Sequence, residues 1–205
     1  MESPQPPVRA KRLNLGSVHN FLKDHGFDYL ILFLIGAVII GLDQWTKALV
    51  RARIPPGNDW LPDGLAWLLP YARIRHWHNT GAAFGIFQNG NLVFTILAII
   101  VILLILYYFP RTERNDWWLR VAMAMQFAGA AGNLIDRLVF AQVTDFISVG
   151  NFAIFNVADA SISVGVAVLL LGVWLKERAE KKSSAINASL KEKVREPIDD
   201  EAKSG

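Results

Sequence analysis

Side chains that could carry out acid–base chemistry stand at a few points of an otherwise apolar chain. Asp145 lies in "VTDF" and Asp159 in "FNVADASI", where Asn156 precedes it by three residues. Two carboxylates close together in a medium of low dielectric constant do not both ionise easily, so one keeps its proton while the other accepts one. Such a pair can activate water for attack on a peptide carbonyl. The two aspartates therefore predict aspartic-protease chemistry, provided that the fold brings them together.

Further polar residues stand at the ends of the long apolar runs. They are Asp43, Gln44, Lys47, Asn79, Asn133, Asp136, Arg137 and Asn156. On a helix, Asn133, Asp136 and Arg137 share one face because their spacing is i, i+3 and i+4. The same holds for the pair Asn156 and Asp159. Asp136 is the alternative to Asp145 as the partner of Asp159.

Structural interpretations stand beside these catalytic ones. Asp145 and Asp159 could act as helix caps, since an acidic group interacts favourably with a helix N-terminus. Asp136 and Arg137 are expected to form a structural ion pair, and Asp43 is expected to anchor the loop that follows it. We therefore place Asp145, rather than Asp136, in the catalytic pair.

Metal and serine chemistry are the other possibilities. His76 and His78 in "HWHN" could start a metal site, but no third ligand lies near them, so we expect an interfacial role. Ser161 and Ser163 have no basic residue at a helical spacing and are expected to pack between helices. The chain has no cysteine, which excludes disulfides and thiolate catalysis. We expect no metal ion and no organic cofactor.

The elements that position these residues are transmembrane helices. The sequence is 53% hydrophobic, and its mean hydropathy is +0.29, which is typical of a small membrane protein. Apolar runs predict helices at about 29–50, 91–110, 117–138 and 154–175. The third run is the most polar and is rich in small residues, which predicts a central helix packed against protein. The predicted fold is an all-α polytopic membrane protein with four transmembrane helices.

Polar segments divide the rest of the chain. Residues 1–27 form an N-terminal tail, and the run that follows lacks a small-residue cleavage site, so we expect it to be retained. Residues 51–90 form a small β-containing lobe between the first two helices, in which "ARIRHWHN" alternates like a strand. Trp60, Trp67 and Trp77 suit a membrane interface. The domain of 28–175 is followed by a charged tail, 176–205, expected to be part helix and part disordered.

The distribution of Lys and Arg predicts the orientation of the chain. These residues concentrate in the N-terminal tail, in 111–120 and after Leu175, whereas the 51–90 segment has four arginines. Because cytoplasmic segments carry the excess of basic residues, both termini are expected in the cytoplasm. The lobe and the polar residues described above would then lie near the extracytoplasmic face.

Five segments occur together in one order along the four predicted helices. They are "LDQWTK" (42–47), "NTGAAFG" (79–85), "GNLIDR" (132–137), "VTDF" (143–146) and "FNVADASI" (155–162). In these segments the chain resembles the bacterial lipoprotein signal peptidases, or signal peptidase II, over about residues 29–175. The resemblance implies an inner-membrane aspartyl endopeptidase. It would cleave diacylglyceryl-modified prolipoproteins before the lipid-bearing cysteine.

The resemblance also implies roles for individual residues. The catalytic pair falls on Asp145 and Asp159. The supporting or substrate-binding positions are Asp43, Lys47, Asn79, Asn133, Asp136, Arg137 and Asn156. The implied partners are the prolipoprotein substrate and membrane lipid; no nucleic acid is expected, and the protein is expected to act as a monomer.

Two other functional classes account less well for the sequence. A transporter would spread polar groups through the membrane depth or show inverted repeats, but the inner halves of the second and fourth runs are apolar and no repeat is visible. A non-catalytic scaffold does not account for the five polar segments. The sequence therefore favours the peptidase.

Overall fold

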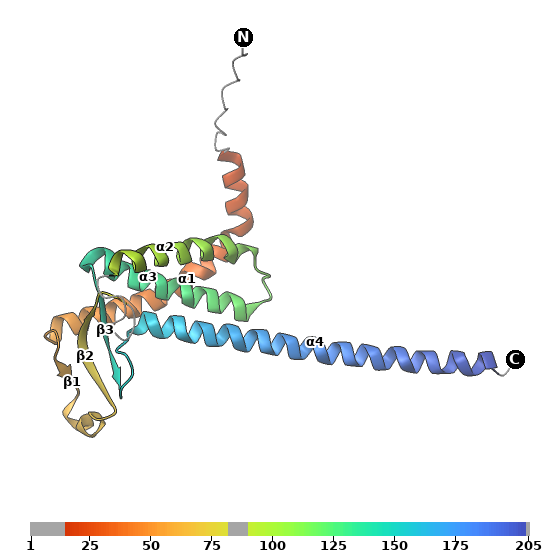
Figure 1. The fold of residues 1–205 in the computed structure, drawn as a ribbon. Coiled ribbons are helices and arrows are strands. Elements are labelled where there is room, and N and C mark those ends of the chain that lie inside the picture. The colour runs from red at the N-terminus through yellow and green to blue at the C-terminus, as the bar shows by residue number, and fades with distance from the viewer. Residues whose placement is uncertain (1–14, 82–89, 204–205) are drawn as a thin grey trace, which may run out of the picture.

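The computed structural model describes residues 15–81 and 90–203, in which four long helices carry a small sheet at one end (Figure 1). The helices are α1 (Leu15–Arg53), α2 (Asn91–Tyr108), α3 (Trp117–Phe140) and α4 (Val157–Lys203), with short 3-10 helices η1 (Asp63–Leu68) and η3 (Phe109–Arg111). The strands are β1 (Asp59–Trp60), β2 (Ala72–Asn79) and β3 (Val143–Val149). Much of the "NTGAAFG" segment, 82–85, lies outside the described residues.

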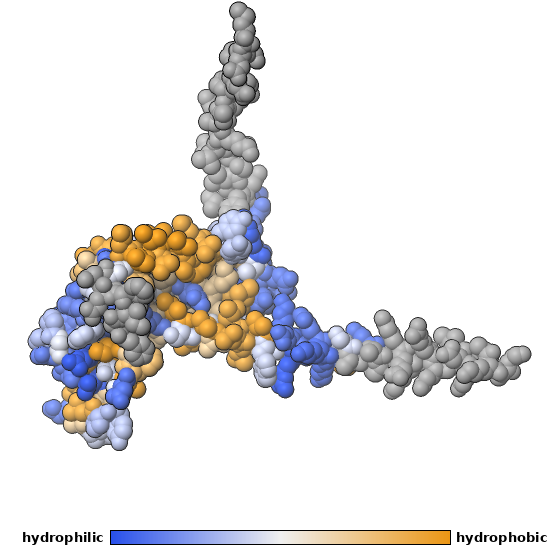
Figure 2. Space-filling model, in the orientation of Figure 1, coloured by the Kyte–Doolittle hydropathy of each residue, from blue (hydrophilic) through white to orange (hydrophobic). Residues whose placement is uncertain are grey.

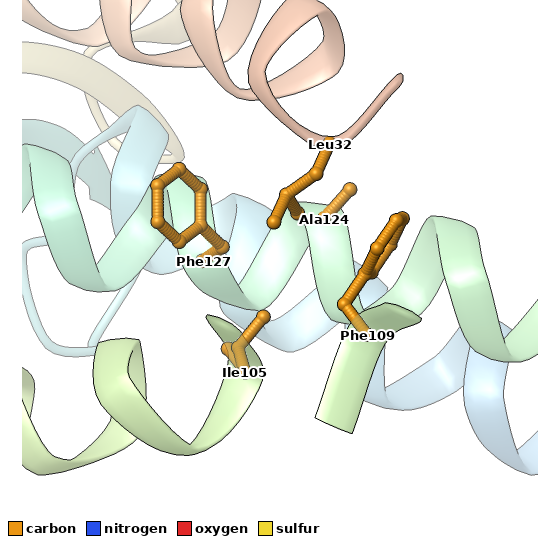
Figure 3. Packing of buried hydrophobic residues seen from close by; sticks show 5 residues of the cluster. All are labelled: Leu32, Ile105, Phe109, Ala124 and Phe127. Carbon is orange, nitrogen blue, oxygen red and sulfur yellow. The ribbon is translucent and has the colours of Figure 1, made fainter. Parts of the chain in front are cut away.

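Helix α3 is the centre of the bundle and packs against α1, α2 and α4. Its small residues allow this, since helices approach closely where side chains are small. At Gly129, a Cβ atom would lie 2.5 Å from the Ala158 carbonyl oxygen of α4. Figure 3 shows the apolar core on the opposite side of α3, where Phe127 and Ala124 meet Leu32 of α1 and Ile105 of α2. The expectation of a central, protein-packed helix at 117–138 is thus confirmed.

Three helices are long and apolar enough to cross a membrane within the described part of the chain. These segments are Lys23–Arg53, Asn91–Arg111 and Val157–Ser184. Most of their apolar side chains are exposed in the isolated chain, and Figure 2 shows a continuous apolar surface over α2. Apolar helices exposed in this way belong in a bilayer. Helix α3 is too polar to count as a fourth span by composition alone.

The three strands form one antiparallel sheet in the order β1-β2-β3. The strand predicted at 72–79 is confirmed with the same bounds. The third strand is a correction, because the segment containing Asp145 was expected to be a loop between helices. It is instead β3, which pairs with β2 across 64 to 77 residues of sequence and ties the lobe to the bundle. The pairing shifts register between Ile74 and Trp77, as at a β-bulge.

Two helices are longer than expected. Helix α1 begins at Leu15 rather than near residue 29, and α4 continues from the bundle to Lys203 without ending at Leu175 (Figure 1). The segment after Leu175 contains mostly Lys, Glu, Arg, Ala and Ser, and has no glycine or proline before Pro197. Such residues extend a helix readily once it has been nucleated.

Candidate functional site

Asp145 lies on β3 at the junction of the sheet and the bundle, where Trp77 of β2 is its cross-strand partner. Its side chain is held by two amides: Asn79 Nδ2 donates to Oδ2 at 2.9 Å, and Asn156 Nδ2 donates to Oδ1 at 2.7 Å. Because Asp145 lies in a strand, the interpretation of this residue as a helix cap is wrong.

Asp159 lies in the first turn of α4 and takes part in a capping box. The backbone N–H of Asn156 donates to Asp159 Oδ2 at 3.2 Å, and the Asp159 N–H donates to Asn156 Oδ1 at 2.9 Å. The cap interpretation therefore holds for one carboxylate oxygen. The other, Oδ1, accepts a hydrogen bond of 2.7 Å from Asn133 Nδ2 of α3. Asp159 is fixed by both helices, with its remaining acceptor capacity available.

Two asparagines connect the two carboxyl groups. Asn156 Nδ2 donates both to Asp145 Oδ1 and, at 3.1 Å, to Asn133 Oδ1, while Asn133 Nδ2 donates to Asp159. Lys47 Nζ donates to the same Asn133 oxygen at 2.9 Å. The lysine therefore orients Asn133 so that its NH₂ group faces Asp159. This chain of hydrogen bonds brings Asp145 and Asp159 into one polar cluster.

Asp136 has a different environment from the other two aspartates. Its carboxylate is fully buried, 3.4 Å from Lys47 Nζ and 3.6 Å from Arg51, and it accepts the Thr144 N–H at 2.9 Å. Arg137, the ion-pair partner expected for Asp136, is wrong, because adjacent residues of a helix point in different directions. The cations that contact Asp136 are instead Lys47 and Arg51 of α1. Asp136 binds α3, α1 and β3 together.

Asp43 also differs from expectation, because it binds the start of a helix rather than the loop that follows it. Its Oδ1 accepts the Ala158 N–H at 2.9 Å, one of the backbone donors that a helix N-terminus leaves without an internal partner. Its Oδ2 lies 2.8 Å from Lys47 Nζ. Both Asp43 and Lys47 are completely buried. Through this pair, α1 fixes the first turn of α4 and hence Asp159.

A cavity of about 560 Å³ lies beside Asp145 and Asp159. Asn79, Asn133 and Arg137 also line it, and its other walls are mainly apolar residues of α2, α4 and the loop before α4, including Phe94, Phe155, Ile162 and Val164. The Arg137 guanidinium carbon lies 5.6 Å from the centre of the Phe94 ring. Asp43, Lys47 and Asp136 do not line this cavity. A largely apolar cavity with two carboxyl groups on its wall suits an apolar substrate that presents one polar bond.

Burial, and after it the nearby charge of Asp159, raise the pKa of Asp145 to about 7. The hydrogen bonds from Asn79 and Asn156 oppose this shift, since they favour the ionised form. At neutral pH, the Asp145 carboxyl group can therefore hold a proton next to a second carboxyl group.

Three residues of the cluster were not among the predicted site residues. Arg51 donates to Thr144 Oγ1 at 3.0 Å, and Gln44 Nε2 donates to the Gly132 carbonyl oxygen and to Asp136 Oδ1, at 3.0 and 3.2 Å. The spacing of Asp43, Lys47 and Arg51 at i, i+4 and i+8 is a signal that could have identified Arg51. Thr144 gave no such signal, because its role depends on β3.

The histidines and serines can also be placed. His76 is buried, and its Nδ1 lies 2.6 Å from the Ile54 carbonyl oxygen, so the interfacial role expected for it is wrong. His78 Nε2 lies 3.0 Å from His76 Nε2, and no cluster of three metal-ligating residues occurs among the described residues. Ser161 donates to the Met125 carbonyl oxygen, so the packing expected of it is confirmed, whereas Ser163 lines the cavity.

Comparisons with known proteins agree with one another. The sequence profile of the family described as Signal peptidase (SPase) II matches residues 35–175. The lipoprotein signal peptidase of Halalkalibacterium halodurans is 38% identical over 158 residues, which cover 75% of this chain and 97% of that protein. That of Enterococcus faecalis is 34% identical, covering 75% and 93%.

Solved structures of bacterial membrane enzymes are also similar to this chain. A bacterial membrane enzyme determined by the in meso method at 2.3 Å resolution superposes with a TM-score of 0.65 at 31% identity, covering 74% of this chain and 91% of that one. A second, at 1.9 Å resolution, gives a TM-score of 0.61 at 31% identity, covering 70% and 92%. The chain belongs to the signal peptidase II family, the membrane proteases that remove signal peptides from prolipoproteins.

Proposed function

We propose that this protein cleaves diacylglyceryl-modified prolipoproteins just before the lipid-bearing cysteine, with Asp145 and Asp159 as its catalytic pair. The observation that carries the proposal is the shared position of these two carboxyl groups. They lie on the wall of one cavity and are linked through Asn156 and Asn133. Asp136, the alternative partner, is fully buried among cations and does not line this cavity.

The mechanism follows from one proton shared by the pair. The Asp159 carboxylate accepts a proton from water as the water oxygen attacks the scissile carbonyl carbon. Asp145, protonated because of its raised pKa, donates a hydrogen bond to the carbonyl oxygen as negative charge develops there. A proton then passes to the amide nitrogen as the C–N bond breaks. The products are the carboxylate of the signal peptide and the free amine of the lipid-bearing cysteine.

The supporting residues keep this geometry. Lys47 orients Asn133, Asp43 holds the first turn of α4, and Asn79 fixes Asp145 from the sheet. Arg137 lies on the cavity wall, where a guanidinium group can bind carbonyl oxygens of the substrate. No metal ion is part of this mechanism, so chelators are expected to leave the activity unchanged.

We further propose that α3 is the fourth membrane-crossing helix and that the sheet lies at the extracytoplasmic surface, with both termini in the cytoplasm. The exposed indoles of Trp60, Trp67 and Trp77 support an interfacial sheet. The excess of Lys and Arg in the segments away from the sheet supports the orientation. The substrate's acyl chains would then stay in the bilayer while its scissile bond reaches the cavity. The peptidase unit comprises 28–175, flanked by the two tails.

Three Asp→Asn variants, assayed in detergent with a lipid-modified prolipoprotein, test the proposal. Asp145→Asn and Asp159→Asn should each lower the cleavage rate by at least about 100-fold, which is typical of losing a general acid or base. Asp136→Asn should lower the melting temperature, yet retain cleavage at temperatures where it is folded. Circular dichroism confirms that each variant is helical. Normal cleavage by a folded Asp145→Asn variant would move its role to another residue.

A further inference from the structure

A second cavity, of about 360 Å³, lies where the end of α1 meets the sheet. Residues of α1 and of all three strands line it, and most of them are apolar, among them Leu49, Ile74 and Phe146. Among the described residues, it shares no lining residue with the catalytic cavity. Phe146 lines this cavity and Asp145 lines the other, since adjacent residues of a strand point to opposite faces. We call this separate cavity the α1 pocket.

The α1 pocket lies at the end of a helical segment that is long and apolar enough to cross a membrane, Lys23–Arg53. Apolar side chains on one face of α1 lead to it. Val38, Leu42 and Trp45 are 64%, 49% and 61% exposed, and Leu49, which lines the pocket, continues their spacing at i, i+4, i+7 and i+11. In a bilayer this face contacts acyl chains. A chain that lies along it therefore meets the pocket near the level of the lipid headgroups.

Arg53 is the charged residue that lines the α1 pocket. It is exposed, and within residues 15–81 and 90–203 its side chain makes no ion pair or hydrogen bond. Thr46 also lines the pocket, but its hydroxyl group already contacts the Leu42 and Asp43 carbonyl oxygens of its own helix, at 2.8 and 2.9 Å. The polar group that is available to a ligand is therefore the Arg53 guanidinium, whose planar set of N–H donors fits a phosphate group.

The charge around the α1 pocket favours an anion. The segment 51–79 contains four arginines and two aspartates. Of these aspartates, Asp59 already lies 3.2 Å from Arg73 Nε and 3.4 Å from Arg75 Nε. The remaining positive charge would repel the cationic group of a zwitterionic lipid and attract a lipid with a net negative charge. Trp60, which is 53% exposed and lines the pocket, is also suited to the headgroup region.

We propose that the α1 pocket binds an anionic phospholipid, with one acyl chain inside the pocket and the phosphate group against Arg53. Charge complementarity identifies this occupant, because the diacylglyceryl group of a lipid-modified protein carries no phosphate for Arg53 to bind. The apolar pocket takes the chain, and its volume lies within the range of small-molecule sites, about 300–1,000 Å³. The proposal goes beyond the peptidase activity, because it assigns a ligand to the opposite face of β3.

The bound chain should stabilise the protein through the wall of the α1 pocket. Val50, Ile54 and Phe146 line the pocket and form one buried apolar cluster, against which Val157 of α4 packs. A ligand that binds only the folded state raises the melting temperature. The anionic lipid should therefore raise the melting temperature of this protein above its value in a zwitterionic lipid.

Quenching of Trp60 fluorescence tests binding directly. The full chain is reconstituted into vesicles of phosphatidylglycerol and phosphatidylcholine in equal amounts, with brominated acyl chains on one lipid at a time. The signal of Trp60 is the difference between each protein and its Trp60→Phe counterpart. Brominated phosphatidylglycerol should quench Trp60 more strongly, with a preference of about fivefold, as for one arginine near an anionic group. Equal quenching of Trp60 by the two lipids would overturn the proposal.

Three variants separate the pocket from the general charge of the surface. Arg53→Gln should abolish the preference for phosphatidylglycerol. The matched control is Arg75→Gln, which removes an arginine that does not line the pocket and should keep the preference. Thr46→Phe fills the pocket while leaving Arg53 in place and should also abolish the preference. An equal loss in Arg75→Gln, or a preference that survives in Thr46→Phe, would show that no lipid is held in the pocket.

Melting temperatures in the two lipids distinguish lipid binding from a structural role of Arg53. An arginine in the last turn of a helix also interacts favourably with the helix C-terminus. If that were its role, Arg53→Gln would lower the melting temperature equally in both lipids, which would contradict the proposal. We expect the variant to lose only the extra stability that phosphatidylglycerol gives the parent. These measurements need no cleavage, so they test the α1 pocket independently of the catalytic pair.

Discussion

At the scale of single residues, surroundings give chemically identical aspartates different properties. Asp136 lies against Lys47 and Arg51, and these contacts hold α3 and α1 together. Asp145 has only neutral amides as hydrogen-bond partners, and burial with a second carboxyl group nearby raises its pKa to about 7. A group that titrates near the working pH can donate and regain a proton during a reaction. The choice between these two aspartates therefore depends on which cations the fold brings to each.

The raised pKa of Asp145 predicts the pH dependence of cleavage. As the pH rises through about 7, Asp145 loses the proton that the mechanism requires, so kcat/KM should fall on the alkaline side of this value. Measurement of kcat/KM between pH 5 and 9 should show this decline. Asn79→Ala removes a hydrogen bond that favours the ionised form, so its decline should begin at a higher pH. A constant kcat/KM from pH 6 to 9 would contradict the assignment of Asp145.

At the scale of elements, the hydrophobic patterns of the sequence predicted the helices and the strand that depend on residues close together in the chain. The apolar runs predicted the cores of the four helices, and the alternation in "ARIRHWHN" predicted β2 with the correct bounds. Strand β3 could not be predicted in this way, because its pairing partner lies far away in the sequence and five of its seven residues are buried, which removes the alternation. The same limit applied to Thr144 and to the attachment of Asp43 to α4. Their contacts exist only once three elements have met.

The close contact of α3 and α4 leads to a prediction about small residues. Gly129→Ala would place a methyl group 2.5 Å from the Ala158 carbonyl oxygen and from Ile162 Cγ1, so α4 must move away. Because Asp159 lies one residue after Ala158, this variant should lose both thermal stability and cleavage activity. Gly41→Ala is the matched control, since its Cβ would have no neighbour within 4 Å and alanine favours a helix. Equal melting temperatures for the two variants would show that the close approach of α3 and α4 at Gly129 does not determine stability.

At the scale of the whole molecule, the two ends of the bundle contain different polar clusters. The second cluster lies at the end away from the sheet. Asp28 of α1 is buried there, 2.8 Å from the buried Arg120 of α3 and 3.3 Å from Arg114. The Arg120 guanidinium also stacks over Phe109, 4.4 Å from its ring centre. Along α1, about 22 Å separates Asp28 from Asp43, so this second cluster cannot contact a substrate bond held at the sheet end.

The second cluster should therefore affect folding and not catalysis. Asp28→Leu leaves Arg120 buried without its carboxylate, which should lower the free energy of unfolding by about 3–5 kcal/mol. The double variant Asp28→Leu/Arg120→Met removes both charges and should recover most of this loss, because an apolar pair of similar size replaces the ion pair. Thermal unfolding in detergent measures both effects, and kcat/KM measured well below each melting temperature should remain that of the parent. A loss of kcat/KM in the folded double variant would show that the two ends of the bundle are coupled, with α1 and α3 transmitting the change to Asp43 and Asn133.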